Sequence, residues 1–91
     1  MANHGERQRL KNIKTLEKHL GDGFIVCSYK GGFQIYKKGT ASLTYPTGIR
    51  AYFRPVWGKW HLTSQQLGLD KPDIHLKEGV KFINLASLLV V

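Results

Sequence analysis

Hydrophobic residues near the N-terminus recur at the spacing of a helix. They fall on one stripe, made of Leu10, Ile13, Leu16 and Leu20. This periodicity predicts a helix over residues 3–20. Asn3 is suited to cap it, with Glu6 three residues later, and Gly21 is suited to end it. We expect the hydrophobic stripe to pack against a sheet.

From residue 24 onward, the pattern changes to short β-prone runs separated by glycine and proline. The predicted strands are residues 24–29, 33–37, 40–45, 49–54 and 59–62. Gly31-Gly32 and Lys38-Gly39 suit tight hairpin turns, and Pro55 interrupts the alternation of residues 49–54. These runs predict an antiparallel sheet of three to five strands.

Two-residue turns would place directly opposed residues of the first three strands on the same face. The more hydrophobic face, which we expect to be the core beneath the helix, carries Ile25, Cys27, Tyr29, Tyr36, Ala41, Leu43 and Tyr45. The other face is rich in lysine and hydroxyl groups, and carries Val26, Ser28, Lys30, Phe33, Ile35, Lys37, Ser42 and Thr44. We expect Phe33 to be exposed at the tip of this second face.

The last third of the chain has weaker patterns. Residues 62–67 suit a short helix capped by Thr63 or Ser64, residues 70–73 suit a loop, and Ile74 to Lys77 suit a strand before a turn at Glu78-Gly79. Residues 80–91 fit a helix or two strands. The expected fold is therefore α+β: a single small basic domain over residues 1–91, with an N-terminal helix on an antiparallel sheet and short C-terminal elements.

Charge narrows the choice of partner. The formal net charge is +8, and residues 63–91 carry three basic and three acidic side chains. The whole excess therefore lies in the first 62 residues. A localised positive field favours phosphate backbones or an acidic protein surface.

Residues 49–54 combine this charge with an aromatic ring. Alternation places Arg50, Tyr52 and Arg54 on one side of the strand. Arginine binds phosphate in bidentate fashion, and a tyrosine between two arginines offers a stacking surface for a base. Lys59 and His61 extend this patch if the chain turns back after Pro55. The alternative is an ordinary amphipathic strand whose basic side is simply solvated.

Other candidate contacts lie outside this strand. We expect Trp60 to be buried and Trp57 to be partly exposed, where it can stack on a base or fill a partner's pocket. Phe33 and Lys30 are candidate contacts at the first hairpin. Cations of the predicted helix that can follow a phosphate backbone are Arg7, Lys11, Lys14 and Lys18, although such a row of charges is usually just a solvated helix face.

The sequence predicts no catalytic, metal or cofactor site. The histidines and Cys27 lack the short spacings of zinc ligands, and the six acidic residues form no paired-carboxylate motif. One cysteine cannot form an internal disulfide, the longest apolar run is only residues 88–91, and the N-terminus does not have the pattern of a signal peptide. A cytoplasmic protein without membrane contact is expected.

Residues 16–46, LEKHLGDGFIVCSYKGGFQIYKKGTASLTYP, resemble HicA-type messenger-RNA-interfering toxins in their helix–strand order and in the Lys30-Gly31 corner. Gly32-Phe33 stands where that family has its signature histidine, and the segment after Pro46 departs from the family pattern. The resemblance implies an α-β-β-β order and contact with RNA or DNA. It does not imply ribonuclease activity.

These observations predict a non-enzymatic module that binds DNA or RNA through a cationic sheet face interleaved with aromatic rings. The alternative is a small inhibitor or adaptor, for example from a mobile element, that docks its basic face on a larger acidic or nucleic-acid-binding protein. The nearly uncharged run at residues 84–91 is a candidate core element or homodimer strand.

Overall fold

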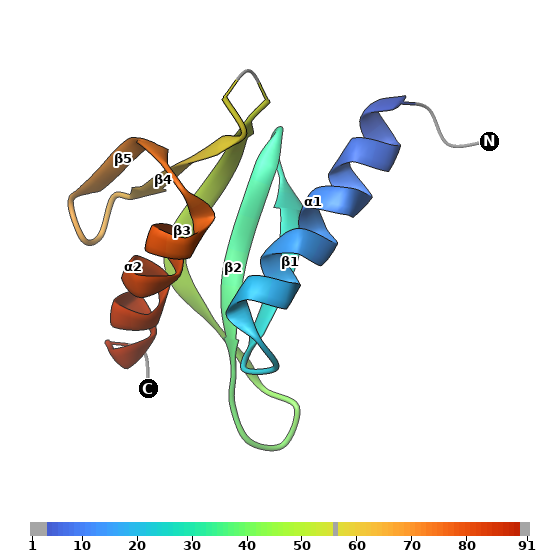
Figure 1. Ribbon diagram of the computed structural model, residues 1–91. Helices are drawn as coiled ribbons and strands as arrows, with labels where there is room; N and C mark the ends of the chain where they lie inside the picture. Colours follow the sequence, from blue (N-terminus) through green and yellow to red (C-terminus); the bar gives the residue numbers. More distant parts are fainter. Residues whose placement is uncertain (1–3, 56, 90–91) are drawn as a thin grey trace.

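The computed structural model describes residues 4–55 and 57–89. Its elements are α1 (His4–Leu20), β1 (Phe24–Tyr29), β2 (Gly32–Lys38), β3 (Thr44–Arg54), β4 (Lys59–Ser64), β5 (Leu69–Ile74) and α2 (Leu76–Leu88). The strands form one antiparallel sheet in chain order, β1 to β5, and both helices lie on the same face of it (Figure 1). The predicted α+β fold is confirmed.

Helix α1 buries only part of its hydrophobic stripe. Leu16 is fully buried, and Ile13 and Leu20 pack at the edge of the core. Leu10 is 48% exposed, contrary to expectation, because it lies off the face of α1 that buries Asn12 and Leu16. Gly21 ends the helix at φ +82°, donating its N–H to the Glu17 carbonyl at 2.9 Å, as predicted for a left-handed C-terminal cap. The predicted cap, Asn3, lies outside the described residues.

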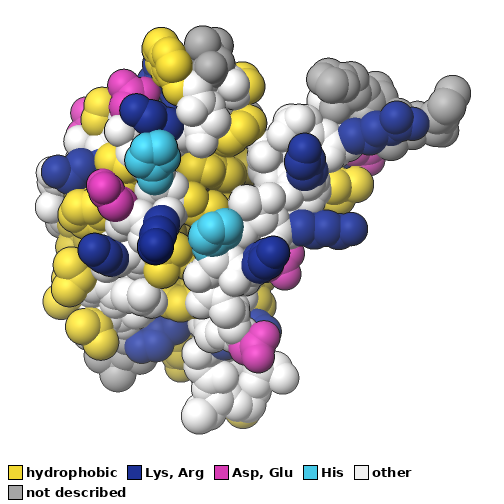
Figure 2. Space-filling model, in the orientation of Figure 1, with side chains coloured by type: hydrophobic (Ala, Val, Ile, Leu, Met, Phe, Trp, Pro, Cys, Tyr) yellow, Lys and Arg dark blue, Asp and Glu magenta, His cyan; other side chains and the backbone are white. Residues whose placement is uncertain are grey.

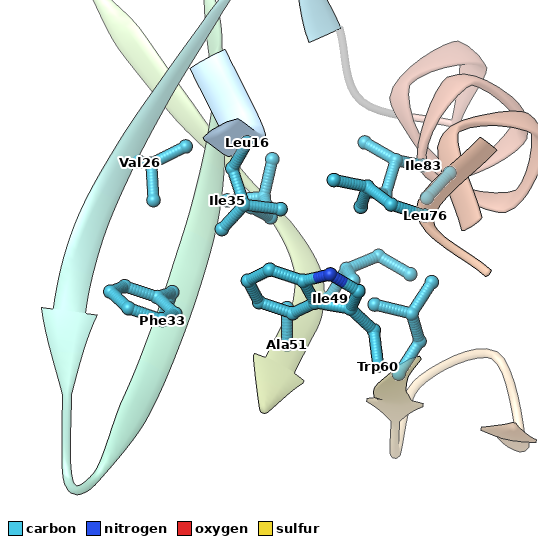
Figure 3. Packing of buried hydrophobic residues seen from close by; sticks show 11 residues of the cluster. Leu16, Val26, Phe33, Ile35, Ile49, Ala51, Trp60, Leu76 and Ile83 are labelled. Carbon is cyan, nitrogen blue, oxygen red and sulfur yellow. The ribbon is translucent and has the colours of Figure 1, made fainter. Parts of the chain in front are cut away.

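The expected core face of the sheet is wrong. The helices cover the face that carries Val26, Phe33 and Ile35 (Figure 3), whereas Ile25, Cys27, Tyr29 and Tyr36 lie on the opposite face. The cause is the pairing of β3 with β2 and with β4. Phe33 is opposite Ala51, which is opposite Leu62, so the most hydrophobic side chains of the central strands share the face of Phe33.

In β3 the expected faces are also wrong, because Tyr45 pairs with Lys37 and therefore lies on the helix-covered face, not on the face of Tyr36. The residues of β1 and β2 were sorted correctly into two faces, and the register of the first hairpin explains why. Lys30 and Gly31, at φ 40° and 82°, form its turn, and Ser28 pairs with Phe33. The predicted turn at Gly31-Gly32 would have opposed Lys30 to Phe33 instead. The pairing differs by two residues, and an even shift leaves every side chain on its own face.

Strand β3 is longer than predicted. Residues 40–43 form a turn rather than a strand, with positive φ at Ala41 and Ser42 and with Leu43 53% exposed. One continuous strand then runs through Pro46 and Gly48, where the β2–β3 register shifts. Such a bulge tolerates proline, which cannot donate a ladder hydrogen bond.

The predicted helix at residues 62–67 and the loop at 70–73 are also wrong. Strand β4 continues to Ser64, a turn follows, and β5 includes Pro72. Proline is tolerated there because β5 is an edge strand of the sheet.

Helix α2 resolves the ambiguity of the C-terminal region. Gly79, expected in a turn, lies inside this helix, and a Cβ at this position would be 3.0 Å from Leu62 Cδ1. Glycine therefore lets α2 approach β4 closely. Lys37 of β2 donates a hydrogen bond to the Ser87 carbonyl at 2.9 Å and ties the end of the helix to the sheet. In the described part of the chain, neither helix is long and apolar enough to span a membrane.

Candidate nucleic-acid interface

The face of the sheet opposite the two helices, called the open face below, has β3 at its centre. Arg50, Tyr52 and Arg54 project from it, as their alternation predicts, while Ile49 and Ala51 are buried beneath the helices. Arg50 is exposed, and Tyr52 and Arg54 are half-buried. Strand β3 alone therefore presents two guanidinium groups with a phenol ring between them.

Strand β4 extends this row on the open face. Lys59 lies opposite Arg54, and His61 lies opposite Tyr52 with ring centroids 6.1 Å apart. His61 Nε2 is 2.6 Å from Asp70 Oδ1 of β5. This contact holds the imidazole in place beside Tyr52, in agreement with the predicted extension of the patch.

Tyr52 owes its position to a glycine on the neighbouring strand. The Tyr52 ring fills the space that a side chain at Gly32 would occupy, and a Cβ there would also be 2.7 Å from the Ala51 carbonyl oxygen. Gly32 is thus required by a close approach rather than by the turn. The ring lies across β2, which brings it towards β1.

Tyr29 of β1 completes the aromatic row, although the sequence pattern predicts it on the core face. The Arg50 guanidinium carbon lies 4.6 Å from the Tyr29 ring centroid, and Lys30 Nζ lies 5.4 Å from the same centroid. Cations at this distance from a ring are attracted by its electron density. Tyr29 was assigned to the core because its strand was expected to be buried on this side.

The turn between β3 and β4 carries Trp57. Its side chain is 58% exposed, as predicted, and Arg54 Cζ lies 5.2 Å from its ring. Asp73 of β5 is 4.0 Å from Arg54 Nη1 and offsets part of its charge. Trp60, three residues later, is 3% exposed and packs against Phe53 at a centroid distance of 5.2 Å. The two tryptophans therefore divide as expected into a surface residue and a core residue.

Phe33 does not belong to this surface. It is 4% exposed and contacts Trp60 at a ring-centroid distance of 6.1 Å. The prediction of Phe33 as an exposed stacking residue is wrong, because its face of the sheet is the one that the helices cover.

The helix lysines do not join it either. Lys11, Lys14 and Lys18 are exposed, but α1 lies on the helix-covered side of the sheet. Figure 2 shows that side, where basic side chains are interspersed with acidic and histidine side chains. The structure therefore separates the lysine row from the cations of β3.

The residues that the structure brings together are called the open-face cluster. They are Tyr29, Lys30, Arg50, Tyr52, Arg54, Trp57, Lys59 and His61. Cations able to contact phosphate alternate with rings able to contact bases. Within residues 4–55 and 57–89, no group of three or more histidine, cysteine or acidic side chains gathers as metal ligands would.

Comparison with known proteins adds no further assignment. No family model, no curated protein and no solved structure matches the chain. The chemistry of the open-face cluster is therefore the basis for a functional proposal.

Proposed function

We propose that the protein binds nucleic acid through the open face of its sheet, without chemical action on the bound strand. The observation that carries the proposal is the row Arg50, Tyr52 and Arg54 on a strand whose outer surface neither described helix covers. Arginine supplies bidentate contacts to phosphate, and exposed rings supply stacking surfaces for bases.

The ring–cation pairs support this proposal further. Arg50 lies against Tyr29, and Arg54 lies against Trp57. Each pair holds a flexible guanidinium near a ring before a ligand arrives. Less side-chain freedom is then lost on binding, which favours affinity.

The test is fluorescence anisotropy of labelled 20-nucleotide DNA and RNA with the full chain at increasing salt. Contact with about three phosphates by Arg50, Arg54 and Lys59 gives a log–log salt slope of about −2 for a single strand. Binding independent of salt, or no binding at low salt, would contradict the proposal. Substrate recovered intact on a denaturing gel, with and without divalent metals, supports binding without cleavage.

A second function is favoured by one observation, the exposed Trp57 beside Arg54. Exposed tryptophan and arginine are the residues most enriched at the centres of protein interfaces. The alternative is that the same surface docks on an acidic or nucleic-acid-binding protein. A single stoichiometric partner that survives nuclease treatment, combined with no binding to free DNA or RNA, favours this alternative.

A further inference from the structure

A cavity of about 750 Å³ opens beside the open-face cluster. Its polar lining comes from β2, β3, β4, β5 and the β4–β5 turn, and includes Gln34, Arg50, His61, Thr63, Gln66 and Asp70. The volume is within the range of small-molecule sites in proteins. Arg50 and His61 of the open-face cluster lie on its lining, whereas the other lining residues have no part in the proposed phosphate contacts.

The bulge in β3 builds the cavity, and buried hydrogen bonds hold the bulge. Gly48 has φ +81°, and the Gln66 side chain of the β4–β5 turn occupies the place of its missing Cβ. Thr47 Oγ1 donates to the Ile35 carbonyl at 2.7 Å and accepts from the Ile49 N–H at 3.2 Å. The bulge is therefore fixed to β2, and the Gln66 side chain of the turn packs against it.

The polar groups on the lining include both donors and acceptors. Tyr36 donates its hydroxyl to Gln34 Oε1 at 2.9 Å, which leaves the Gln34 amide NH₂ as a donor. Asp70 uses one carboxylate oxygen for His61 and keeps the other as an acceptor. Thr63, which pairs with Arg50 on one side and Asp70 on the other, can donate or accept. The lining therefore suits a ligand with donors and acceptors on its edge.

The charges distinguish a base from a phosphate. Asp70 repels an anion placed in the cavity, whereas Arg50 at the other side attracts one. Arg50 and Asp70 stand two strands apart, so their backbones are separated by about 10 Å across Thr63. The volume of the cavity accommodates one heterocycle over Thr63, and the Arg50 guanidinium, which lies against Tyr29 of β1, faces the phosphate at the edge of the cavity.

We propose that this cavity takes one unpaired nucleobase of a single strand whose phosphates follow Arg50, Arg54 and Lys59. The inference rests on the proposed function and adds the class of substrate. A base in a duplex is paired on the edge that the cavity would contact, and a single strand leaves that edge free.

The experiment compares labelled homopolymer 12-mers of each DNA base, a mixed 12-mer, its duplex and heparin as ligands in anisotropy titrations. Wild-type protein is expected to bind single strands about 10-fold tighter than the duplex and to differ about 5-fold between homopolymers, a value in the range of one or two net hydrogen bonds. Thr63→Val and Asp70→Asn are expected to remove the difference between homopolymers.

The controls separate recognition from general electrostatics. Thr63→Val leaves the charge unchanged, so duplex and heparin affinities should be unaltered. Thr40→Val, at an exposed position that is not part of the cavity lining, should match wild type. Asp70→Asn removes a negative charge. If Asp70 acted only through its charge, this variant would raise affinity for all ligands equally and keep the homopolymer preference.

The outcomes are distinct for the two proposals. Loss of homopolymer preference in either folded variant, verified by unchanged circular dichroism, supports the base site. Equal wild-type affinity for single strands and duplex, or preference that persists in both variants, overturns the base site but leaves nucleic-acid binding intact. No binding to any strand at low salt overturns both.

Discussion

The Tyr52 ring occupies the position that a side chain at residue 32 would take on the adjacent strand. This relationship links the fold to the candidate site, because the absence of a side chain at Gly32 determines where the Tyr52 ring lies on the open face. Substitutions at Gly32 and Tyr52, made singly and together, can therefore test this contact.

Gly32→Ala is expected to destabilise the protein by about 1–3 kcal/mol, because the new methyl group overlaps the Tyr52 ring. Adding Tyr52→Ala should restore part of the lost free energy of unfolding. The restoration is partial because the new Cβ also meets the Ala51 carbonyl oxygen, which stays in place. Urea denaturation of the two single variants and the double variant measures this coupling.

Gly23→Ala is the matched control, since nothing lies within 4 Å of a Cβ at that position. It should leave the midpoint of unfolding nearly unchanged. Equal destabilisation by Gly23→Ala and Gly32→Ala would show that loss of glycine, rather than contact with Tyr52, is responsible.

Arg50→Ala is expected to weaken nucleic-acid binding and to reduce the magnitude of the salt slope by about 0.7, the contribution of one single-strand phosphate. Lys14→Ala removes the same charge from α1, on the helix-covered side of the sheet. Its slope should match wild type if binding occurs at the open face. Identical losses in the two variants would indicate a response to net charge alone.

The part of the open face that the sequence predicts correctly is the part that depends on local patterns alone. The outward positions of Arg50, Tyr52 and Arg54 followed from strict alternation, and their partners Lys59 and His61 followed from the turn after Pro55. These inferences needed only one strand and one hairpin. They hold because side-chain direction along a strand has a period of two.

Which face of the sheet forms the core could not be decided from local patterns. Ile25, Cys27 and Tyr29 are about as apolar as Val26, Phe33 and Ile35, so β1 and β2 alone do not say which set is buried. The decision comes from the register between β2 and β3. Lys38 pairs with Thr44 across a five-residue turn instead of the predicted two-residue turn, and this odd difference in pairing moves the side chains of β3 to the other face. The errors at Phe33 and Tyr29 have this one cause. The wrong prediction of a loop around Pro72 has a similar reason. A strand tolerates proline there only because β5 is an edge strand, which the local sequence does not show.

The two tryptophans should respond to truncation in opposite ways. Trp60→Ala removes a buried ring and is expected to cost about 3–5 kcal/mol of stability, whereas Trp57→Ala, at a 58% exposed position, should change stability by less than about 0.5 kcal/mol. If Trp57 stacks on a base, its truncation should weaken binding by about 1–3 kcal/mol.

Tryptophan fluorescence separates the two residues without loss of fold. In Trp57→Phe, the remaining emission comes from buried Trp60 and should resist quenching by acrylamide and by added oligonucleotide. The wild-type emission should be quenched by both. Quenching by oligonucleotide that persists in Trp57→Phe would place the ligand away from the β3–β4 turn.

Cys27 provides a native footprint of the open face. It is exposed on β1, and its cross-strand neighbours Gln34 and Arg50 lie in the same row. A thiol reagent such as 5,5′-dithiobis-(2-nitrobenzoic acid) should therefore modify one thiol per folded chain without denaturant. A nucleic-acid strand bound over Arg50 covers this row. Saturating oligonucleotide should therefore slow the thiol reaction about 10-fold at low salt, in line with occupancy of the site.

The protection of Cys27 should disappear as added salt releases the oligonucleotide. Arg50→Ala, which binds more weakly, should lose protection at lower salt than Lys14→Ala. Unchanged reactivity at saturation would show that the strand lies elsewhere, since a ligand on α1 leaves Cys27 open to solvent.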